Sequence, residues 1–303
     1  MQIDTLKIDK DFFKEEVRCN YTVSSKMKKV WAVELDMLKK IEEICDKYEI
    51  TYYADSGTLI GVVRHNGFIP WDDDIDIVMK RDDYNKFLDV AEKELKYPYF
   101  LQTAYTDKGY CRAHAQLRNS STTGFILDDE KREFNKGIFL DIFPLDELPD
   151  SNFKLKIQLL RMKLLWKILF SGSYHCKEKK YSLKQNIFYI FTKPVVKILT
   201  FQRLFKHYEN LSSKYNNKGN KRISYIAYSR GKEKHIWNKE WFDGTIKMKF
   251  EDIEINVPKG YDERLKKEYG DYMKISKAPT AHGEITFEPD IPYEQYFREK
   301  NGE

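Results

Sequence analysis

The chain has 303 residues, 41% of them hydrophobic, which is enough for one large domain or two modest ones with a sizeable core. Its mean hydropathy of −0.67 and the absence of any run of about 18 apolar residues exclude a membrane-spanning helix. The four cysteines form no CxxC pair, so neither a zinc site nor a disulfide framework is expected. Residues 1–16 lack the apolar core of a secretory signal, and we expect a cytoplasmic protein.

The net charge of +5 hides an asymmetry between one segment and the rest of the chain. Residues 153–206 hold thirteen Lys or Arg against one acid, Glu178, so this basic segment carries +12 and the remainder −7. Such a division predicts that the basic segment meets something anionic. The alternative is a helical lid whose apolar faces pack on the core while its lysines are only solvated.

Apolar periodicity and turn residues divide residues 1–150 into helices and strands that we expect to form one core. Asp82 is expected to cap a helix. The expected elements are a helix over 24–48, a strand over 50–54, a short helix over 57–63, a strand over 75–79, a helix over 82–95, and strands over 99–103, 112–118, 123–127 and 137–142.

The composition changes near Pro149, where we place the boundary of a helical insertion over 151–215. A helical stretch over 183–213 should be broken by Pro194. Residues 216–303, with a hairpin over 245–257 and a short helix over 262–269, are expected to complete the core. Residues 153–170 predict a basic amphipathic helix whose apolar side comprises Leu155, Leu159, Met162, Trp166 and Leu169.

The most informative segment is residues 52–79, YYADSGTLIGVVRHNGFIPWDDDIDIVM. A turn of small residues follows an apolar run, and four acids then come together directly before a second apolar run. Carboxylates this close repel one another, so the cluster indicates either a bound cation or a solvated acidic turn. The acids are Asp72, Asp73, Asp74 and Asp76.

Asp74 and Asp76 are spaced i, i+2, which places both on one face of a strand. The strand continues into Ile-Val-Met, where an unpaired carboxylate would lose its hydration at a cost. Two hard oxygen ligands on one face suit a divalent cation, Mg²⁺ or Mn²⁺. Asp141, a lone acid in the strand over 137–142, is a candidate third ligand, although a salt bridge or a strand-end cap would also explain it.

The turn formed by Ser56, Gly57 and Thr58 is a candidate phosphate cradle, because glycine permits close backbone approach and amides at a helix start favour anions. Arg64, just after this helix, and Arg118 are candidate phosphate ligands from the two sides. Each arginine could equally be an ordinary surface residue, and Ser-Gly-Thr is also a common turn.

Residues 54–84, ADSGTLIGVVRHNGFIPWDDDIDIVMKRDDY, resemble the signature of the LicD family of phosphotransferases, which is related to the fukutin group. Residues 137–149, GIFLDIFPLDELP, are similar to the family's second conserved block, and residues 269–279, YGDYMKISKAP, to its third. The resemblance spans residues 25–295 and is weakest in the basic segment.

The resemblance implies an α/β (α+β) fold like that of the nucleotidyltransferases, a mixed sheet flanked by helices, with residues 1–150 as the catalytic core and the basic helices as an insertion. The family's turn, DxD pair and third Asp fall on Gly57-Thr58, on Asp74 and Asp76, and on Asp141. These three acids are the implied metal ligands and catalytic residues.

The resemblance also implies a CDP-activated alcohol as donor, most often CDP-choline, and a hydroxyl of a cell-surface glycan as acceptor. Teichoic acid, lipopolysaccharide and capsular polysaccharide are the acceptors of this kind, and CMP is released. A lipid-linked acceptor would bring residues 153–206 to the inner face of the membrane as a peripheral contact.

Other reactions stay open. Relatives that move ribitol phosphate leave phosphoribitol or phosphoglycerol as possible cargo. True nucleotidyl transfer, which adds NMP to a small molecule or a protein, would keep the fold but release pyrophosphate. A non-enzymatic module that binds nucleic acid is the third alternative. The complete set of carboxylates argues against it, because acids without a metal repel phosphate, and we expect no nucleic-acid partner.

Overall fold

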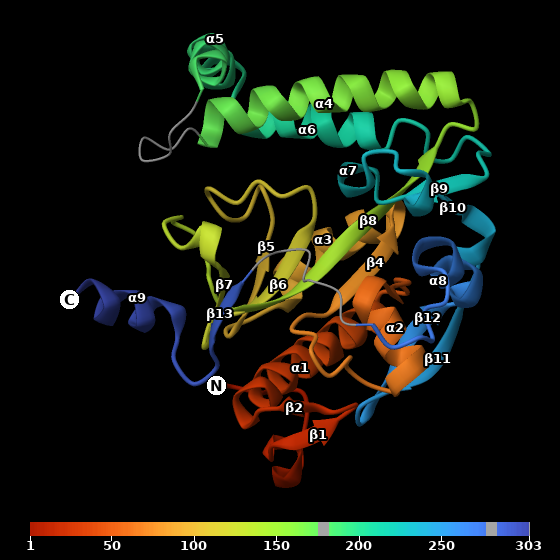
Figure 1. Cartoon of the computed structure of the whole chain (residues 1–303). Helices are drawn as coiled ribbons and strands as arrows, with labels where there is room; N and C mark the ends of the chain where they lie inside the picture. The colour runs from red at the N-terminus through yellow and green to blue at the C-terminus, as the bar shows by residue number, and fades with distance from the viewer. Residues whose placement is uncertain (175–181, 277–283, 303) are drawn as a thin grey trace. The chain divides into compact units, whose positions relative to one another are not determined.

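The computed structural model describes residues 1–174, 182–276 and 284–302. The chain forms two compact units, Met1–Pro144 with Trp241–Glu303, and Leu145–Glu240. Helices combine with a mixed sheet, so the predicted α+β class is confirmed (Figure 1). Among the described residues, no helix is both long enough and apolar enough to cross a bilayer.

The central sheet of the first unit is built around two strands that carry acids, β4 (Asp76–Lys80) and β8 (Ile138–Leu148). These two strands are neighbours, and β3 (Tyr53–Ala54) pairs antiparallel with β4. On the other side of β8, β6 (Ala115–Asn119) pairs antiparallel with both β8 and β5 (Tyr99–Gln102). The register sets Gln116 opposite Asp141.

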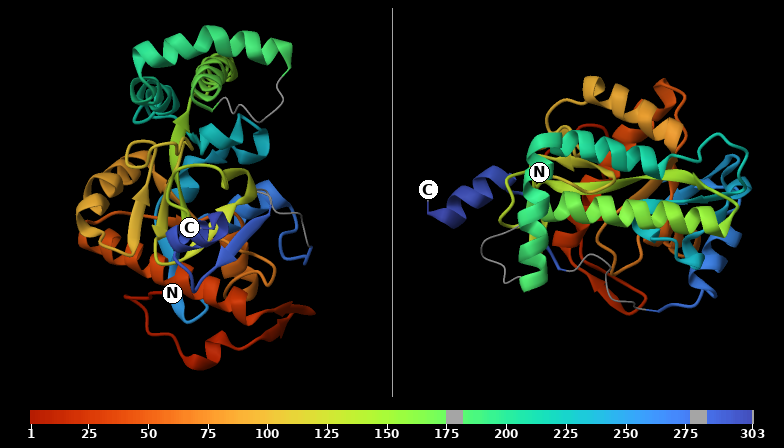
Figure 2. Two further views of the ribbon diagram at one scale, coloured as in Figure 1. Left: turned by 90° about the vertical axis from the view of Figure 1, so that its left-hand side faces the viewer. Right: turned by 90° about the horizontal axis from the view of Figure 1, so that it is seen from above.

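Two long helices pack together against this sheet (Figures 1 and 2). Helix α1 (Ser25–Lys47) contacts β6, and α3 (Arg81–Glu94) contacts β4 and β5. The Ser24 hydroxyl caps α1 by accepting a hydrogen bond from the Met27 amide, as expected for a serine at this position. Much of α1 is buried, because it lies under the sheet along most of its length.

The predicted elements of this unit are present with shifted ends. The strand expected over 50–54 shrinks to β3, and the strand expected over 137–142 continues to Leu148. Asp82 lies in the first turn of α3 and is not its N-cap, which is Lys80 without a side-chain capping bond. Asp82 still favours the helix there, because an acid in the first turn interacts well with the helix dipole.

The C-terminal region returns to the first unit. The predicted hairpin is present as β11 (Thr245–Phe250) and β12 (Ile253–Pro258), followed by α8 (Tyr261–Tyr269). Sequence reasoning missed several short elements of this unit. One is the pair of strands β1 (Glu16–Arg18) and β2 (Tyr21–Val23), and another is β13 (Ile285–Glu288), which pairs with β7 (Thr123–Ile126). The others are α9 (Tyr293–Asn301) and short 3₁₀ turns at Lys10–Phe13 and Leu127–Asp129.

The second unit is mainly helical. Helix α4 (Asn152–Tyr174) packs on α5 (Leu183–Leu199) and α6 (Phe201–Ser212), and α5 crosses α4 (Figures 1 and 2). Of the predicted apolar side of α4, Leu155, Met162 and Leu169 are buried. Part of the basic segment, residues 175–181, lies outside the described residues.

Two predictions for the second unit need correction. The helical break expected at Pro194 lies at Thr200, whose φ of 58° leaves the helical region, whereas Pro194 stays inside α5. A proline removes one hydrogen bond and kinks a helix, but it need not end it. Residues 216–240, which sequence placed with the C-terminal region, fall in this unit. Here β9 (Arg222–Ser224) pairs with the end of β8 and with β10 (Trp237–Asn238), and α7 (Ile226–Ser229) lies between them in sequence.

A buried ion pair ties α8 to the residue that precedes α2 (Ser56–His65). Arg264 Nη2 lies 2.6 Å from Asp55 Oδ1, and its Nη1 lies 2.7 Å from Glu268 Oε2. Arg264 and Asp55 are 0% and 1% exposed. Such a pair adds little net stability relative to apolar packing, but losing one partner leaves a buried charge unpaired.

We therefore expect Arg264→Met to lower the free energy of unfolding by about 3–5 kcal/mol, because two buried carboxylates would lose their cation. Urea denaturation monitored by circular dichroism measures this. The control is Lys266→Met on the same helix, whose side chain is 65% exposed, so its loss should leave the urea midpoint almost unchanged. Equal stability of the two variants would contradict this role of Arg264.

Candidate metal and phosphate site

Three of the predicted acids come together at the edge of β4 and β8. Ligand atoms of Asp74, Asp76 and Asp141 all lie within 4.8 Å of one another, and so do those of Asp72, Asp73 and Asp74. Asp74 therefore belongs to both groups. All donors are carboxylate oxygens, the ligands that hard divalent cations prefer, so the residues present suit Mg²⁺ or Mn²⁺.

Backbone hydrogen bonds hold these acids in place. The Asp141 amide donates to the Ile75 carbonyl at 2.9 Å, which fixes β8 beside the residue between Asp74 and Asp76. The Asp76 amide donates to the Thr58 hydroxyl at 2.9 Å, and the Asp55 amide donates to the Asp76 carbonyl at 3.0 Å. The start of α2 is thus joined directly to the strand that begins at Asp76, and the Thr58 hydroxyl positions Asp76.

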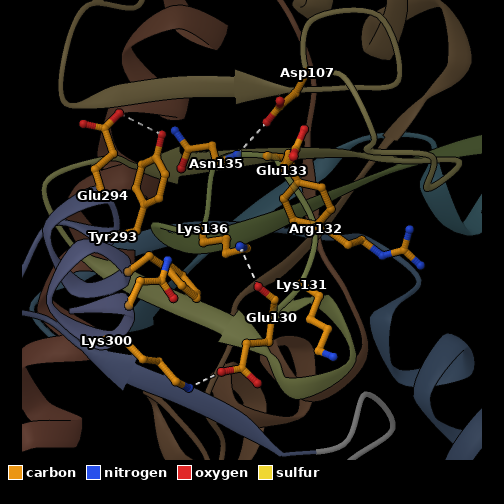
Figure 3. A pocket seen from close by; sticks show the side chains of 13 residues that line it. Asp107, Glu130, Lys131, Arg132, Glu133, Asn135, Lys136, Tyr293, Glu294 and Lys300 are labelled. Atoms are coloured by element: carbon orange, nitrogen blue, oxygen red, sulfur yellow. Dashed lines mark hydrogen bonds and ion pairs between the residues drawn. The ribbon is translucent and has the colours of Figure 1, made fainter. Parts of the chain in front are cut away.

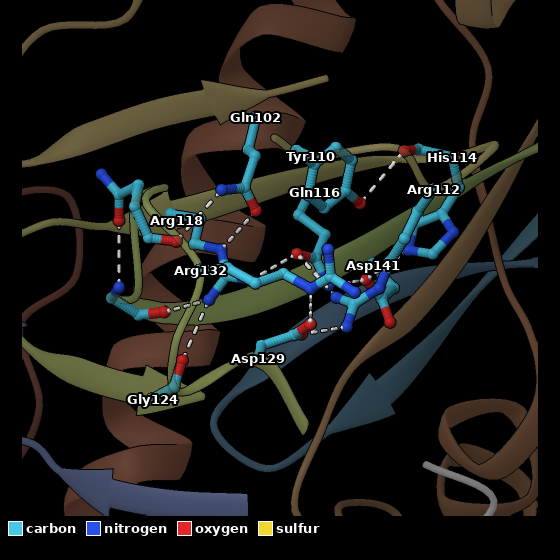
Figure 4. A network of polar contacts seen from close by, with 12 residues as sticks. Gln102, Tyr110, Arg112, His114, Gln116, Arg118, Gly124, Asp129, Arg132 and Asp141 are labelled. Atoms are coloured by element: carbon cyan, nitrogen blue, oxygen red, sulfur yellow. Dashed lines mark hydrogen bonds and ion pairs between the residues drawn. The ribbon is translucent and has the colours of Figure 1, made fainter. Parts of the chain in front are cut away.

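A network of polar side chains holds Asp141 from behind (Figure 4). Its Oδ1 lies 3.0 Å from His114 Nε2 and accepts a hydrogen bond of 2.6 Å from Gln116 Nε2. Arg118 in turn donates to Gln116 Oε1 at 2.6 Å. The Oδ2 atom of Asp141 accepts no hydrogen bond from the described residues and is available to a ligand.

The pKa shifts of the two strand acids run in opposite directions. Burial raises the pKa of Asp76 well above its ordinary value, and the charges of Asp74 and Asp141 raise it further. Burial also acts to raise the pKa of Asp141, but His114, Arg112 and Gln116 outweigh it and lower that pKa. Burial lowers the pKa of His114, so its neutral ring donates from Nε2 to Asp141. A bound cation would favour the charged form of Asp76.

The predicted phosphate cradle lies beside the acids. Ser56 has a φ of 49°, which turns the chain from β3 into α2. A Cβ on Gly57 would lie 2.6 Å from Asp72 Oδ2, so only glycine lets this carboxylate approach the helix start. The start of α2 therefore lies beside the Asp72 carboxylate. Amides at a helix start favour an anion such as phosphate.

The loop that carries the acids is clamped from three distant parts of the chain. Trp31 of α1 donates from Nε1 to the Asp72 carbonyl at 3.0 Å and stacks on Phe68 with ring centroids 4.5 Å apart. Glu251, at the tip of the β11–β12 hairpin, accepts a hydrogen bond of 3.0 Å from the Phe68 amide. Arg18 pairs with both oxygens of Glu251. These contacts limit how far the acids can separate.

The two arginines predicted to hold phosphate are engaged elsewhere. Arg118 is 1% exposed and donates to the carbonyls of Gly124 and Gly137 as well as to Gln102 and Gln116, so it is enclosed within the network behind Asp141. To bind a phosphate, this guanidinium would have to give up some of these partners, and a phosphate contact by Arg118 stays a prediction.

Arg64 is half-buried and donates to the carbonyls of Tyr272 and Lys274 at 2.8 and 3.2 Å. It thereby joins the first resemblance block to the third, of which residues 277–279 lie outside the described residues. A phosphate contact by Arg64 stays a prediction.

Sequence reasoning missed two polar residues of the site. Gln116 gave no signal, because a glutamine in a strand is unremarkable until its neighbour is known. Glu34 gave a signal that was not used: together with Asp36 it interrupts the apolar run VWAVELDML of α1, and it is fully buried. The same reasoning that selected Asp141 would have selected it.

A cavity of about 710 Å³ in the first unit lies apart from these acids (Figure 3). It is lined by the segment 130–136, by Asp107 and by residues of α9, and by none of the three strand acids. Asp107 and Asn135 also contact Gln102, a partner of Arg118. Gln102 therefore joins the lining of the cavity to the network that holds Asp141.

Comparison with known proteins agrees with this geometry. The family model described as "LicD/FKTN/FKRP, nucleotidyltransferase domain" matches residues 49–157. The lipopolysaccharide cholinephosphotransferase LicD of Haemophilus influenzae is 33% identical over 243 residues, which cover 80% of this chain and 89% of that protein. The chain belongs to the LicD family. An uncharacterized protein of Rickettsia prowazekii is 35% identical over 117 residues, 39% of this chain and 40% of that protein.

The part matched by the LicD model contains the cradle, Asp74 in the loop before β4, Asp76 and Asp141 in the strands, and the His114–Gln116 support. It omits Glu34, Glu251 and Arg264, which reach the site region from outside the matched range. The range matched by the family model therefore contains these acids, and segments on both sides of that range supply part of their support.

Two glycines of α2 lie against different kinds of neighbour, one against a side chain that can move and the other against backbone that cannot move easily. In Gly61→Ala the new Cβ would meet the Gly67 carbonyl oxygen at 2.5 Å, and backbone must shift. In Gly57→Ala it would meet only the Asp72 side chain. We expect Gly61→Ala to lower the free energy of unfolding by about 1–3 kcal/mol and Gly57→Ala to lower it by less than half of that.

Urea denaturation of the two variants and the wild type tests this. Helix propensity does not explain a loss, since alanine is the better helix former at both positions. A greater loss in Gly57→Ala than in Gly61→Ala would contradict the assignment of a backbone contact to one glycine and a side-chain contact to the other.

Proposed function

We propose that this protein is a metal-dependent phosphotransferase that moves phosphocholine from CDP-choline to a hydroxyl of a cell-surface glycan and releases CMP. The convergence of Asp74, Asp76 and Asp141 beside the start of α2 carries the proposal. Supporting it, the Haemophilus relative that aligns over 89% of its length is a lipopolysaccharide cholinephosphotransferase. Ribitol phosphate or glycerol phosphate as cargo would use the same site.

Asp74, Asp76 and Asp141 would hold the cation, Mg²⁺ or Mn²⁺. A cation bound there supplies charge neutralisation at the donor's pyrophosphate. Asp141 suits ligation better than proton transfer, because its lowered pKa makes it a weak base and His114 and Gln116 already fix its Oδ1. Its second oxygen can then face the ligand.

The chain's other contribution is positioning. The amides at the start of α2, with Gly57 allowing close approach, would bind phosphate oxygens of the donor. The acceptor oxygen would attack the phosphorus that bears the alcohol, and the bond from that phosphorus to the bridging oxygen would break. CMP leaves with the bridging oxygen, and the acceptor's proton is lost to solvent or a base. Little covalent chemistry falls to the protein, so orientation should dominate the rate.

Nucleotidyl transfer is the alternative with the same site. It differs in which phosphorus is attacked and in the product, pyrophosphate in place of CMP. A carboxylate set with no member missing disfavours a module that only binds an anion, because without a cation these acids would repel it.

The donor is tested by release of CMP in the presence of Mg²⁺ from CDP-choline, CDP-ribitol, CDP-glycerol and CDP-ethanolamine. We expect release from CDP-choline, and a fall of at least about 10²-fold in Asp76→Asn, because that variant loses a charged ligand. The control is Asp89→Asn, which alters an exposed acid on α3.

Release of CMP from a different CDP-alcohol would show that the protein transfers the phosphoalcohol of that donor in place of phosphocholine. Pyrophosphate release from a nucleoside triphosphate, with no CMP from any donor, would replace phosphoalcohol transfer by nucleotidyl transfer. Unchanged release in Asp76→Asn would remove the metal assignment.

We propose in addition that the second unit contacts an anionic membrane, where a lipid-linked acceptor would lie. Besides its buried side, α4 has an exposed apolar stripe, and α5 has another at helical spacing. Lysines on both helices are exposed among them. Apolar side chains flanked by lysines suit the boundary between headgroups and acyl chains. The stripes comprise Phe153, Ile157, Leu160 and Leu164 on α4, and Leu183, Ile187, Ile190, Phe191 and Ile198 on α5.

Flotation with vesicles of phosphatidylcholine and phosphatidylglycerol tests this contact. We expect binding at low salt that weakens with added salt, and binding at least about tenfold weaker in Ile190→Glu/Phe191→Glu, since two apolar side chains are lost and two negative charges gained. Val17→Glu, an exposed apolar residue of the first unit, is the matched control. Absence of binding at low salt, or equal loss in the control, would contradict the proposal.

A further inference from the structure

The cavity of the first unit has no part in the proposed transfer. Its volume of about 710 Å³ lies within the range of small-molecule sites. The segment 130–136 and helix α9, which are far apart in the chain, form most of its wall together with Asp107 (Figure 3). Most of the lining side chains are charged, and both signs are present. Such a wall suits a polar ligand.

Lys136 is the lining residue that points most directly to a ligand. It is 6% exposed, and its Nζ donates to the Glu130 carbonyl at 2.8 Å. The same nitrogen lies 3.9 Å from the centroid of the Phe297 ring. In the part of the chain that the structure describes, no carboxylate forms an ion pair with it.

A buried ammonium in this arrangement lacks acceptors. It has three N–H donors, and the Glu130 carbonyl satisfies one of them. Burial lowers the pKa of Lys136, although the charges of Asp129 and Glu130 act in the opposite direction. An anionic oxygen in the cavity would accept from the remaining donors and would pair with the charge.

The lining carboxylates limit the ligand to one anionic group. Asp107, Glu133 and Glu294 line the cavity, and so does Glu130, whose carboxylate pairs with Lys300. These groups would repel a ligand that carries several phosphates, but they accept hydrogen bonds from hydroxyl groups. A ligand that satisfies both the buried ammonium and the acids therefore has one anionic group and several hydroxyls.

Three aromatic rings complete the wall, those of Phe134, Tyr293 and Phe297. The Phe297 ring packs on Phe125 of β7 with centroids 5.2 Å apart, which holds α9 at the cavity. An aromatic face is apolar and slightly negative, and the C–H groups on one side of a sugar ring suit it. Rings, carboxylates and one ammonium together favour a sugar that carries a single anionic group.

The cavity lies beside the proposed transfer site along the sheet. Antiparallel pairing sets Gln102 opposite Gln116, and Gln116 opposite Asp141, so the three lie in one row across β5, β6 and β8. Two strand spacings separate Gln102 from Asp141, which is about 10 Å. Gln102 in turn donates to Asp107 of the cavity wall at 2.7 Å. A glycan of several sugars is long enough to reach from the cavity to the acids.

We propose that this cavity binds a sugar of the acceptor glycan that carries one anionic group, phosphate or carboxylate, and that Lys136 Nζ donates to this group. The lining carboxylates accept hydrogen bonds from the hydroxyls of the sugar. Another hydroxyl of the same glycan then lies at the acids. Only the assignment of the ligand as the acceptor rests on the proposed function, since an anionic sugar would bind here whatever reaction follows.

Isothermal titration calorimetry of the full chain in EDTA tests this. The probes are the 6-phosphates of glucose, galactose and N-acetylglucosamine, glucuronate and galacturonate, methyl glucoside as a neutral sugar, inorganic phosphate and CMP. EDTA removes any cation from the acids, so a phosphate cannot bind through it. We expect at least one anionic sugar to bind at least about tenfold more tightly than methyl glucoside, inorganic phosphate or CMP. Binding of the sugar phosphates or of the uronates identifies the anionic group.

Two variants separate ligand binding from folding. Lys136→Met should bind that sugar at least about tenfold more weakly, because a charge-assisted hydrogen bond is lost, and its urea midpoint should stay close to that of the wild type. Asn301→Trp changes an exposed lining residue and should weaken binding by filling part of the cavity, with Lys136 in place. Lys26→Met, whose side chain is 52% exposed and pairs with Glu288 outside the lining, is the control and should bind as the wild type does.

Equal affinity for anionic and neutral sugars, tightest binding of CMP, or unchanged affinity in both variants would overturn the inference. A large loss of stability in Lys136→Met would assign that lysine to folding and overturn its role as a ligand contact. CMP release from a CDP-alcohol by a chain that binds none of the sugars would overturn the cavity site alone. Sugar binding without CMP release from any donor would support the cavity site and overturn the proposed function.

Discussion

Repulsion among carboxylates is the constraint on which the rest of this structure depends. Five acids approach one another at the edge of two strands, and all five are partly buried. Left to themselves they would separate or take up protons. The protein prevents separation with bonds that do not involve the carboxylates at all, namely the backbone bonds of Asp76 and Asp141 and the indole of Trp31. The acids therefore converge before any ligand arrives.

Positive charge is arranged differently around the site. Arg118 and Arg264 are both enclosed, and each holds a residue that in turn holds the site, Gln116 in one case and Asp55 in the other. Neither guanidinium faces the region between the acids and α2. With these two arginines in supporting positions, the electrostatic potential of the site stays negative. Such a potential favours binding of a cation first, and an anionic donor can bind only after the cation has bound.

Sequence was informative wherever a residue's chemistry conflicted with its apolar neighbours. The acids of the DxD pair and Asp141 were found this way, and the structure brings them together. The helix predicted over 24–48 and the hairpin predicted over 245–257 are also present. The carbonyl contacts of Arg64 and Arg118 were not predicted, because a sequence shows that an arginine is present but not which carbonyls it meets. Pairings such as β7 with β13 depend on contacts between residues more than 150 positions apart, which no local pattern encodes.

The clamp at the tip of the β11–β12 hairpin has a consequence for how the protein is made. Glu251 and Arg264, which hold the acidic loop and the start of α2, are translated long after the acids themselves. A nascent chain that has emerged only as far as β8 contains every candidate ligand but lacks both restraints. Metal and donor would find a finished site only when the last quarter of the chain has left the ribosome, so a prematurely terminated chain should be inert, not partly active.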